Sequence, residues 1–180
     1  ATARAYNTVF QTGSQQRSSR EFRLACELIR NGRIGKVQTI NVGIGMPSTE
    51  KCLPEEPVPE GFDWERWLGP APWAPYNAER CSGDYSGGWL LIRDYSGGMT
   101  TDWGAHHFDI AQWALGMDGD GPVEIIPPGC DGCDTLTFKY ANGVVMSRGG
   151  ANGILFTGTD GKIEVNRGHL KSWPEEIVKE

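Results

Sequence analysis

Two β-hairpin signals in the last third of the chain constrain its fold more than any other feature. Asn142-Gly143 and Asp160-Gly161 each lie between two short stretches rich in apolar residues. These dipeptides readily adopt the backbone angles of a tight hairpin turn. The flanking stretches, which we expect to be strands, are residues 134–140, 144–148, 154–158 and 162–166. Because hairpins join antiparallel strands, the sequence predicts an α+β fold: an open, mostly antiparallel β-sheet with helices packed on one face.

A helix with one buried face is predicted before this sheet. Apolar residues recur at i, i+3, i+4 and i+7 in Phe22, Ala25, Cys26 and Ile29. Residues 18–21 (Ser-Ser-Arg-Glu) match a capping box, with Ser18 as the N-cap and Glu21 reaching back to it. Asn31-Gly32 has the composition of a helix C-cap. We therefore expect this helix to begin just after Ser18 and to end at Asn31.

The remaining elements are expected from shorter patterns. Residues 36–45 alternate as a strand does, with Ile40, Val42 and Ile44 on one side. Residues 9–12 and 89–92 are expected to be short strands, and residues 2–6 the end of a helix. Residues 46–85 are rich in Pro and Trp and have little periodicity. We expect this stretch to be a long excursion from the sheet.

Residues 102–113 form the predicted helix with the most chemical content. At 100° per residue, Asp102, His106 and Asp109 share one face of this helix. His107 and Ile110 belong to a second face, which we expect to pack against the core. A histidine titrates near neutral pH, so His106 could act as a general acid or base with Asp102 as its partner. The spacing equally allows His106 to be an ordinary helix histidine and Asp102 an N-cap.

Metal binding is not expected on this helix. Asp102, His106 and Asp109 are ligand types, but neither His-Glu-x-x-His nor any other dense set of ligands is present. Cys130 and Cys133 form one isolated C-x-x-C motif, which is more typical of a loop with two incidental thiols than of a zinc or redox site. The five cysteines are an odd and scattered set. We therefore expect reduced thiols and a cytoplasmic location.

The composition and charge exclude two classes of partner. The formal net charge is −6 and the isoelectric point is about 5.1, so we expect no binding to nucleic acid. No apolar run approaches the roughly 20 residues that cross a bilayer, so we expect no membrane partner.

Nucleotide binding by these residues alone has no support in the sequence. Gly43-Ile44-Gly45 lacks the third glycine of the dinucleotide fingerprint G-x-G-x-x-G, and no phosphate-binding P-loop occurs. The Trp-rich stretch 62–73 could form an aromatic wall for a sugar ring, or it could supply core to a loop-rich layer. The sequence leaves both interpretations of these tryptophans open.

The helix motif resembles that of a known family. Residues 102–109, Asp-Trp-Gly-Ala-His-His-Phe-Asp, resemble the D-x-G-x-H-x-x-D motif of the Gfo/Idh/MocA oxidoreductases. Four further stretches resemble the family in the same order along the chain: residues 9–17, 32–37, 63–70 and 158–165. Members are NAD(P)-dependent dehydrogenases of sugars, polyols and related compounds. They have an N-terminal Rossmann domain and a C-terminal α/β domain.

The resemblance implies roles for particular residues. It implies that His106 is the acid/base for the substrate hydroxyl, and that Asp102 is its acidic partner and a substrate hydrogen-bonder. Substrate contacts are implied for four further residues: Gln15, Arg17, Tyr95 and Asp109. The resemblance also implies a sugar or polyol substrate. The exposed face of the open sheet predicts a homo-oligomer.

The family's cofactor-binding features are not found in these 180 residues. Its G-x-G-x-x-G turn and the Lys of its Glu-Lys-Pro segment lie in the Rossmann domain. We expect residues 1–16 to be a remnant of the end of that domain, and residues 17–180 to be the substrate-binding and oligomerisation domain. This chain alone is then expected to bind no NAD(P) and to be inactive. The alternative is a stand-alone, non-catalytic binding or assembly module on the same scaffold.

Overall fold

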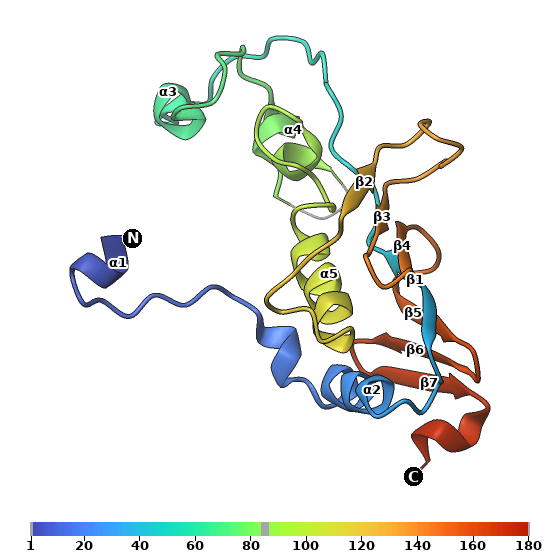
Figure 1. The fold of residues 1–180 in the computed structure, drawn as a ribbon. Helices are drawn as coiled ribbons and strands as arrows, with labels where there is room; N and C mark the ends of the chain where they lie inside the picture. Colours follow the sequence, from blue (N-terminus) through green and yellow to red (C-terminus); the bar gives the residue numbers. More distant parts are fainter. Residues whose placement is uncertain (1, 84–86, 180) are drawn as a thin grey trace.

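A seven-stranded sheet organises the computed structural model, which describes residues 2–83 and 87–179. Its order is β2-β3-β4-β1-β5-β6-β7 (Figure 1). The strands are β1 (Val37–Gly43), β2 (Glu124–Ile126), β3 (Thr137–Lys139), β4 (Val145–Arg148), β5 (Gly153–Gly158), β6 (Lys162–Asn166) and β7 (His169–Trp173). Neighbouring strands are antiparallel except β1 and β4, which are parallel. The predicted α+β fold with a mostly antiparallel sheet is confirmed.

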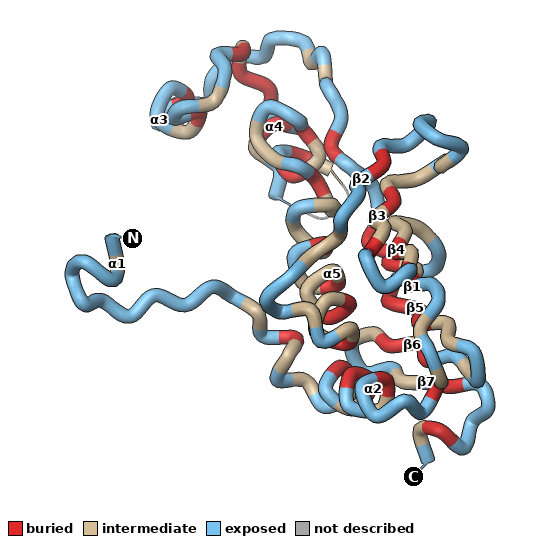
Figure 2. The backbone as a smooth tube through the Cα atoms, in the orientation of Figure 1, coloured by how far each residue is buried: buried red, intermediate tan, exposed pale blue. Residues whose placement is uncertain are grey.

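Two helices cover one face of the sheet. These are α2 (Arg20–Arg30) and α5 (Trp103–Ala114), which also contact each other (Figure 1). The residues that they bury against the sheet include Phe22, Cys26, Ile40, Ile110, Ile154, Phe156 and Ile163. Figure 2 shows this buried layer between the helices and the strands. Burying this apolar area supplies the main stabilisation of the domain.

Both predicted hairpins and the first predicted helix face are confirmed. β3 pairs with β4 across Asn142-Gly143, where Gly143 has φ +86°, and β5 pairs with β6 across Asp160-Gly161. Phe22, Ala25, Cys26 and Ile29 are the buried residues of α2. The predicted capping box is wrong by one residue. The N-cap is Ser19, because Ser18 is the last residue of a 3-10 turn, η1 (Gln15–Ser18). No side chain makes a capping hydrogen bond to the helix.

The two predicted short strands are wrong. Residues 9–12 have no strand partner among the described residues, and they follow a four-residue helix, α1 (Thr2–Ala5), on a segment that extends away from the domain (Figures 1 and 2). Val9 and Phe10 are 94% and 78% exposed. Residues 88–91 form a 3-10 turn, η2 (Gly88–Leu91), in which Leu90 is buried without joining the sheet. Apolar runs this short do not distinguish a strand from a turn.

The excursion between β1 and α5 has a small core of its own. It contains the helices α3 (Trp64–Leu68) and α4 (Ala78–Cys81). Trp64, Leu68 and Tyr76 are buried together, with Trp67 and Tyr95 packed against them. Isolated bridges join Pro47 to Gly98 and Thr49 to Ile92, and these tie the excursion to the end of the domain where α5 begins. The chain closes with the 3-10 turn η3 (Glu175–Val178).

No helix in the described ranges is long and apolar enough to cross a membrane.

Candidate active site on helix α5

Helix α5 lies close to the sheet because its second residue is glycine. A Cβ atom on Gly104 would approach the Phe108 ring to 3.0 Å and the Ile44 side chain to 3.2 Å. Both distances are tighter than ordinary van der Waals contact. The small residue therefore allows the first turn of α5 to sit against the core and fixes where the next side chains of the helix point.

The two adjacent histidines lie in different environments. His107 is fully buried, 6.2 Å from the Phe22 ring and 5.6 Å from the Trp103 ring between centroids. Burial lowers the pKa of His107 to about 4, so this imidazole is neutral at pH 7. The prediction that His107 belongs to the packing face is confirmed.

His106 is only partly buried and keeps one nitrogen available. Its Nδ1 atom is buried and has no hydrogen-bond partner among the described residues. The other ring nitrogen, Nε2, is not among the buried unpaired atoms, which leaves it as the nitrogen that a ligand can reach. His106 therefore has the exposure that an acid/base group requires, whereas His107 does not.

Asp102 holds the N-cap position of α5 without acting as a side-chain cap. Its carboxylate accepts no hydrogen bond from the helix amides. Among the residues that the structure describes, Asp102 also makes no hydrogen bond to His106. The two residues thus share a helix end and a face, and their predicted cooperation stays a prediction. Nor do any three potential metal ligands converge within these described residues.

Arg17 and Asp109 bind each other. The Arg17 Nε and Nη2 atoms donate to the two Asp109 carboxylate oxygens at 2.8 and 2.7 Å, and Nη2 also donates to Asp118 Oδ1 at 2.7 Å. The guanidinium lies 5.4 Å from the centre of the Trp113 ring. These partners raise the pKa of Arg17 above its usual value. The cluster fastens η1 to α5, and it occupies two of the four side chains for which the resemblance implies substrate contacts, Arg17 and Asp109.

Beside Arg17, the glutamine that is buried is Gln16 and not Gln15, the residue for which the resemblance implies a substrate contact. Gln15 is exposed and lines, with Arg17, an open hollow of about 590 Å³ formed by residues 11–15, 17 and 18. No sequence pattern singled out Gln16. It is 3% exposed, and neither atom of its side-chain amide has a hydrogen-bond partner among the described residues. Asp118 was also missed. It follows the end of α5, where no helical periodicity could have placed it beside Arg17.

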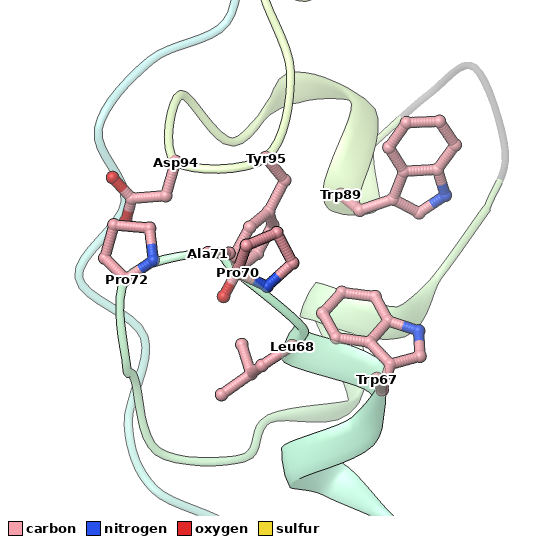
Figure 3. A pocket seen from close by; sticks show the side chains of 8 residues that line it. All are labelled: Trp67, Leu68, Pro70, Ala71, Pro72, Trp89, Asp94 and Tyr95. Atoms are coloured by element: carbon pink, nitrogen blue, oxygen red, sulfur yellow. The ribbon is translucent and has the colours of Figure 1, made fainter.

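Tyr95 belongs to a different part of the molecule from the α5 residues. Its hydroxyl accepts a hydrogen bond from Arg80 Nη1 at 3.1 Å, and its ring meets Trp67 edge-on at 5.4 Å. It lines a pocket of about 440 Å³ on the excursion (Figure 3). None of the contacts of Tyr95 in the described chain is with Asp102, His106 or Asp109.

Comparison with known proteins gives a match to a family model and to solved structures. The Gfo/Idh/MocA sequence model described as "Oxidoreductase family, C-terminal alpha/beta domain" matches residues 36–172. A crystal structure of an oxidoreductase from Thermotoga maritima is similar, with 20% sequence identity and a TM-score of 0.47. That similarity covers 88% of this chain and 43% of the other, so the chain spans less than half of that protein. Comparison with curated protein sequences gives no match.

Proposed function

The chain belongs to the Gfo/Idh/MocA oxidoreductase family, of which it contains the C-terminal α/β domain, and we propose that it is the substrate-binding domain of an NAD(P)-dependent dehydrogenase of sugars or polyols. His106 is the acid/base in this proposal. Asp102 is its acidic partner and a hydrogen-bond acceptor for substrate hydroxyls.

The observation that carries the proposal is the different state of the polar groups at the start of α5. His107 is fully buried and neither of its ring nitrogens has a partner among the described residues, whereas His106 is only partly buried and Nδ1 is its one buried, unpaired nitrogen. The Asp102 carboxylate does not cap the helix. Polar groups with no structural partner at one helix end are typical of a site that binds or transforms a ligand.

His106 and Asp102 each have one task in the proposed reaction. Oxidation of a carbinol removes the hydroxyl proton and a hydride from the carbon that carries it. His106 Nε2 accepts the proton, a task that an imidazole performs as a general base in many enzymes. Asp102 lies at the positive, N-terminal end of α5, where the helix dipole favours a negative carboxylate. This negative charge stabilises the imidazolium that forms on His106.

Two features of the described residues support a proposal that the nicotinamide cofactor does not bind to them. The sheet is mostly antiparallel, and the sequence has no G-x-G-x-x-G turn between a strand and a helix. NAD(P) supplies the hydride acceptor in the family. We propose that the 180 residues alone neither bind NAD(P) nor oxidise substrate.

Self-association through the open face of the sheet is also part of the proposal. Within the described part of the chain no helix covers the face that carries Asn41, Leu155 and Glu164, and these three residues are only partly buried. A second copy of the chain is the occupant we propose for this face. Light scattering at high concentration tests it, and a strictly monomeric mass would contradict it.

Imidazole NMR tests the ligand site without requiring turnover. The chain has three histidines, and His169 provides an internal control because it is exposed and pairs with Glu164 at 3.1 Å. Titration with a panel of polyols and sugars is expected to shift the His106 resonances and to leave those of His169 in place. Equal shifts for both, or none for His106 with any compound, would contradict the proposed substrate site.

A further inference from the structure

The connection between β2 and β3 contains a tight turn with a cysteine on each side. This connection extends beyond the ends of the two strands (Figure 1). Asp131 and Gly132 have φ +48° and +73°, the left-handed backbone of a type I′ turn, which Asp-Gly adopts readily. Cys130 and Cys133 flank the turn and form an antiparallel bridge, in which the Cys133 amide donates to the Cys130 carbonyl oxygen at 2.9 Å. The structure thus places the two cysteines of the C-x-x-C motif opposite each other.

This pairing brings the two thiols within reach of each other. Side chains that lie directly opposite in an antiparallel pair leave the backbone on the same side. The Cα atoms of such a hydrogen-bonded pair are about 5.5 Å apart, and a disulfide spans Cα separations of about 4.4–6.8 Å. A bond between Cys130 and Cys133 can therefore close by rotation of the two side chains while the turn keeps its backbone conformation.

The pair is also open to reaction with molecules in solution. Cys130 is exposed, Cys133 is partly buried, and both thiols are free. The Cys133 Sγ atom donates only a weak hydrogen bond, at 3.9 Å, to the carbonyl oxygen of Asp131. Cys26 differs, because it is buried in the core and its burial raises the pKa of its thiol to about 12. Accessible thiols react and buried ones are inert.

A zinc site within one chain does not fit this pair. A structural zinc ion takes four ligands. No group of three potential metal ligands is found within residues 2–83 and 87–179. Cys130 and Cys133 are therefore matched to each other as two thiols, and this arrangement favours disulfide chemistry.

We propose that Cys130 and Cys133 are a redox modification site, a dithiol that closes reversibly to a disulfide. The co-reactant is a low-molecular-weight disulfide such as oxidised glutathione. One cysteine thiolate attacks a sulfur of this disulfide and releases one small thiolate. The second cysteine then attacks the mixed disulfide, closes the Cys130–Cys133 bond and releases the other small thiolate. Two electrons pass from the pair to the small disulfide, and the two cysteine protons end on the released thiols.

Excess small thiol reverses both steps, because an exposed disulfide is readily attacked. The site lies on the connection between β2 and β3, whereas the proposed acid/base chemistry lies on α5. The inference therefore goes beyond the proposed dehydrogenase function and does not depend on it.

Mass spectrometry of the 180-residue chain after incubation with oxidised glutathione tests the proposal. A peptide that contains residues 130–133 is expected to lose about 2 Da, the mass of the two thiol hydrogens, and to regain it with excess reduced glutathione. Cys52 is the internal control. It is also exposed, but it forms no bridge with another cysteine among the described residues. Cys52 is therefore expected to gain glutathione as a mixed disulfide.

Two variants assign the reaction to the pair. Cys133→Ser is expected to accumulate a mixed disulfide on Cys130, because no second thiol is present to displace the glutathione. Cys52→Ser is the matched control, and its peptide with residues 130–133 should lose the same mass as that of the parent.

The contribution of the turn is measured by comparing the folded chain with the same chain in concentrated urea. In a glutathione buffer, the equilibrium ratio of disulfide to dithiol is expected to be about tenfold higher in the folded chain, the scale of the entropy of closing a loop of about four residues.

The proposal is overturned if the parent accumulates mixed disulfides on Cys130 and Cys133, or if neither thiol reacts while Cys52 does. A disulfide-to-dithiol ratio no higher in the folded chain than in urea would also overturn it. None of these readouts involves turnover, substrate or α5, so failure here is distinguishable from failure of the dehydrogenase proposal.

Discussion

The cluster around Arg17 allows the most quantitative test of how η1 is fastened to α5. Arg17 makes two charge-assisted hydrogen bonds to Asp109 and one to Asp118. The Arg17 and Asp109 side chains are 31% and 27% exposed, so solvent screens the pair only in part. A bidentate pair in this setting contributes more than an exposed one and less than a buried one. We expect an Arg17–Asp109 coupling free energy of about 1.5 kcal/mol.

The substitution Arg17→Ala should lower the free energy of unfolding by more than this coupling free energy. The substitution also removes the Asp118 hydrogen bond and the contact with Trp113, and it leaves two carboxylates without their cation. The expected loss in the free energy of unfolding is about 2–3 kcal/mol. For a chain of this length that corresponds to a fall in Tm of about 5–10 °C.

Urea denaturation followed by circular dichroism measures the cycle of Arg17→Ala, Asp109→Asn and the double variant. Arg23→Ala is the control, because Arg23 pairs with Glu27 at 3.6 Å with side chains 64% and 55% exposed. This control should change stability by about 0.5 kcal/mol or less. A coupling below about 0.5 kcal/mol, or an Arg17→Ala loss no larger than that of the control, would refute the assigned role of the cluster.

Two further predictions concern the core. Burial holds the pKa of His107 at about 4, below its value near 6.5 in the unfolded chain. Between these two pH values the unfolded chain therefore binds more protons than the folded chain. The free energy of unfolding should fall as the pH is lowered from 6.5 to 4, by roughly 3 kcal/mol in total. Urea titrations at several pH values measure this loss, and a pH dependence in that window as steep in His107→Gln as in the parent would contradict it. Gly43→Ala should lower the free energy of unfolding by about 2–4 kcal/mol, since a methyl group at Gly43 would overlap the Ala151 carbonyl oxygen. Urea denaturation measures this loss, with Gly13→Ala as the control. An added Cβ at Gly13 has nothing within 4 Å, so this variant should stay within about 0.5 kcal/mol of the parent, and equal losses in the two variants would be inconsistent with the packing at Gly43.

Local patterns in the sequence were sufficient to predict the main elements of the sheet and both long helices. Asn142-Gly143 specified a hairpin because its backbone preference acts within two residues. The periodicity of α2 and α5 identified their buried faces, including the burial of His107. Signals of this kind depend on neighbours within one or two turns, which a sequence displays directly.

Tertiary packing decided the elements that the sequence did not reveal. β2 and β7 are short edge strands, each with one neighbour, and neither has the apolar alternation of a central strand. Residues 88–91 form a 3-10 turn in which Leu90 is buried while Trp89 stays 40% exposed, so the run of apolar residues did not indicate a strand. Ser19, and not its neighbour Ser18, is the N-cap because η1 extends through Ser18.

The candidate site was predictable only where it lies on a single helix. Asp102, His106 and Asp109 follow one helix face, so their placement was accessible from spacing. The partner of Asp109 is Arg17, 92 residues earlier in the chain, and no local pattern encodes that contact. Tyr95 entered by resemblance, and its aromatic and Arg80 contacts arise from the packing of the excursion.

The role of His106 is the central claim, and turnover measures it most directly. Residues 17–180, joined to a dinucleotide-binding domain of a family member, would be assayed for reduction of NAD(P) with a panel of polyols and sugars. His106→Ala is expected to lower kcat by about 10²–10⁴-fold with cofactor binding unchanged, whereas His169→Ala should retain the parent rate. A His106→Ala variant that keeps kcat within about twofold of the parent would contradict the account, since that is far below the contribution of a general base.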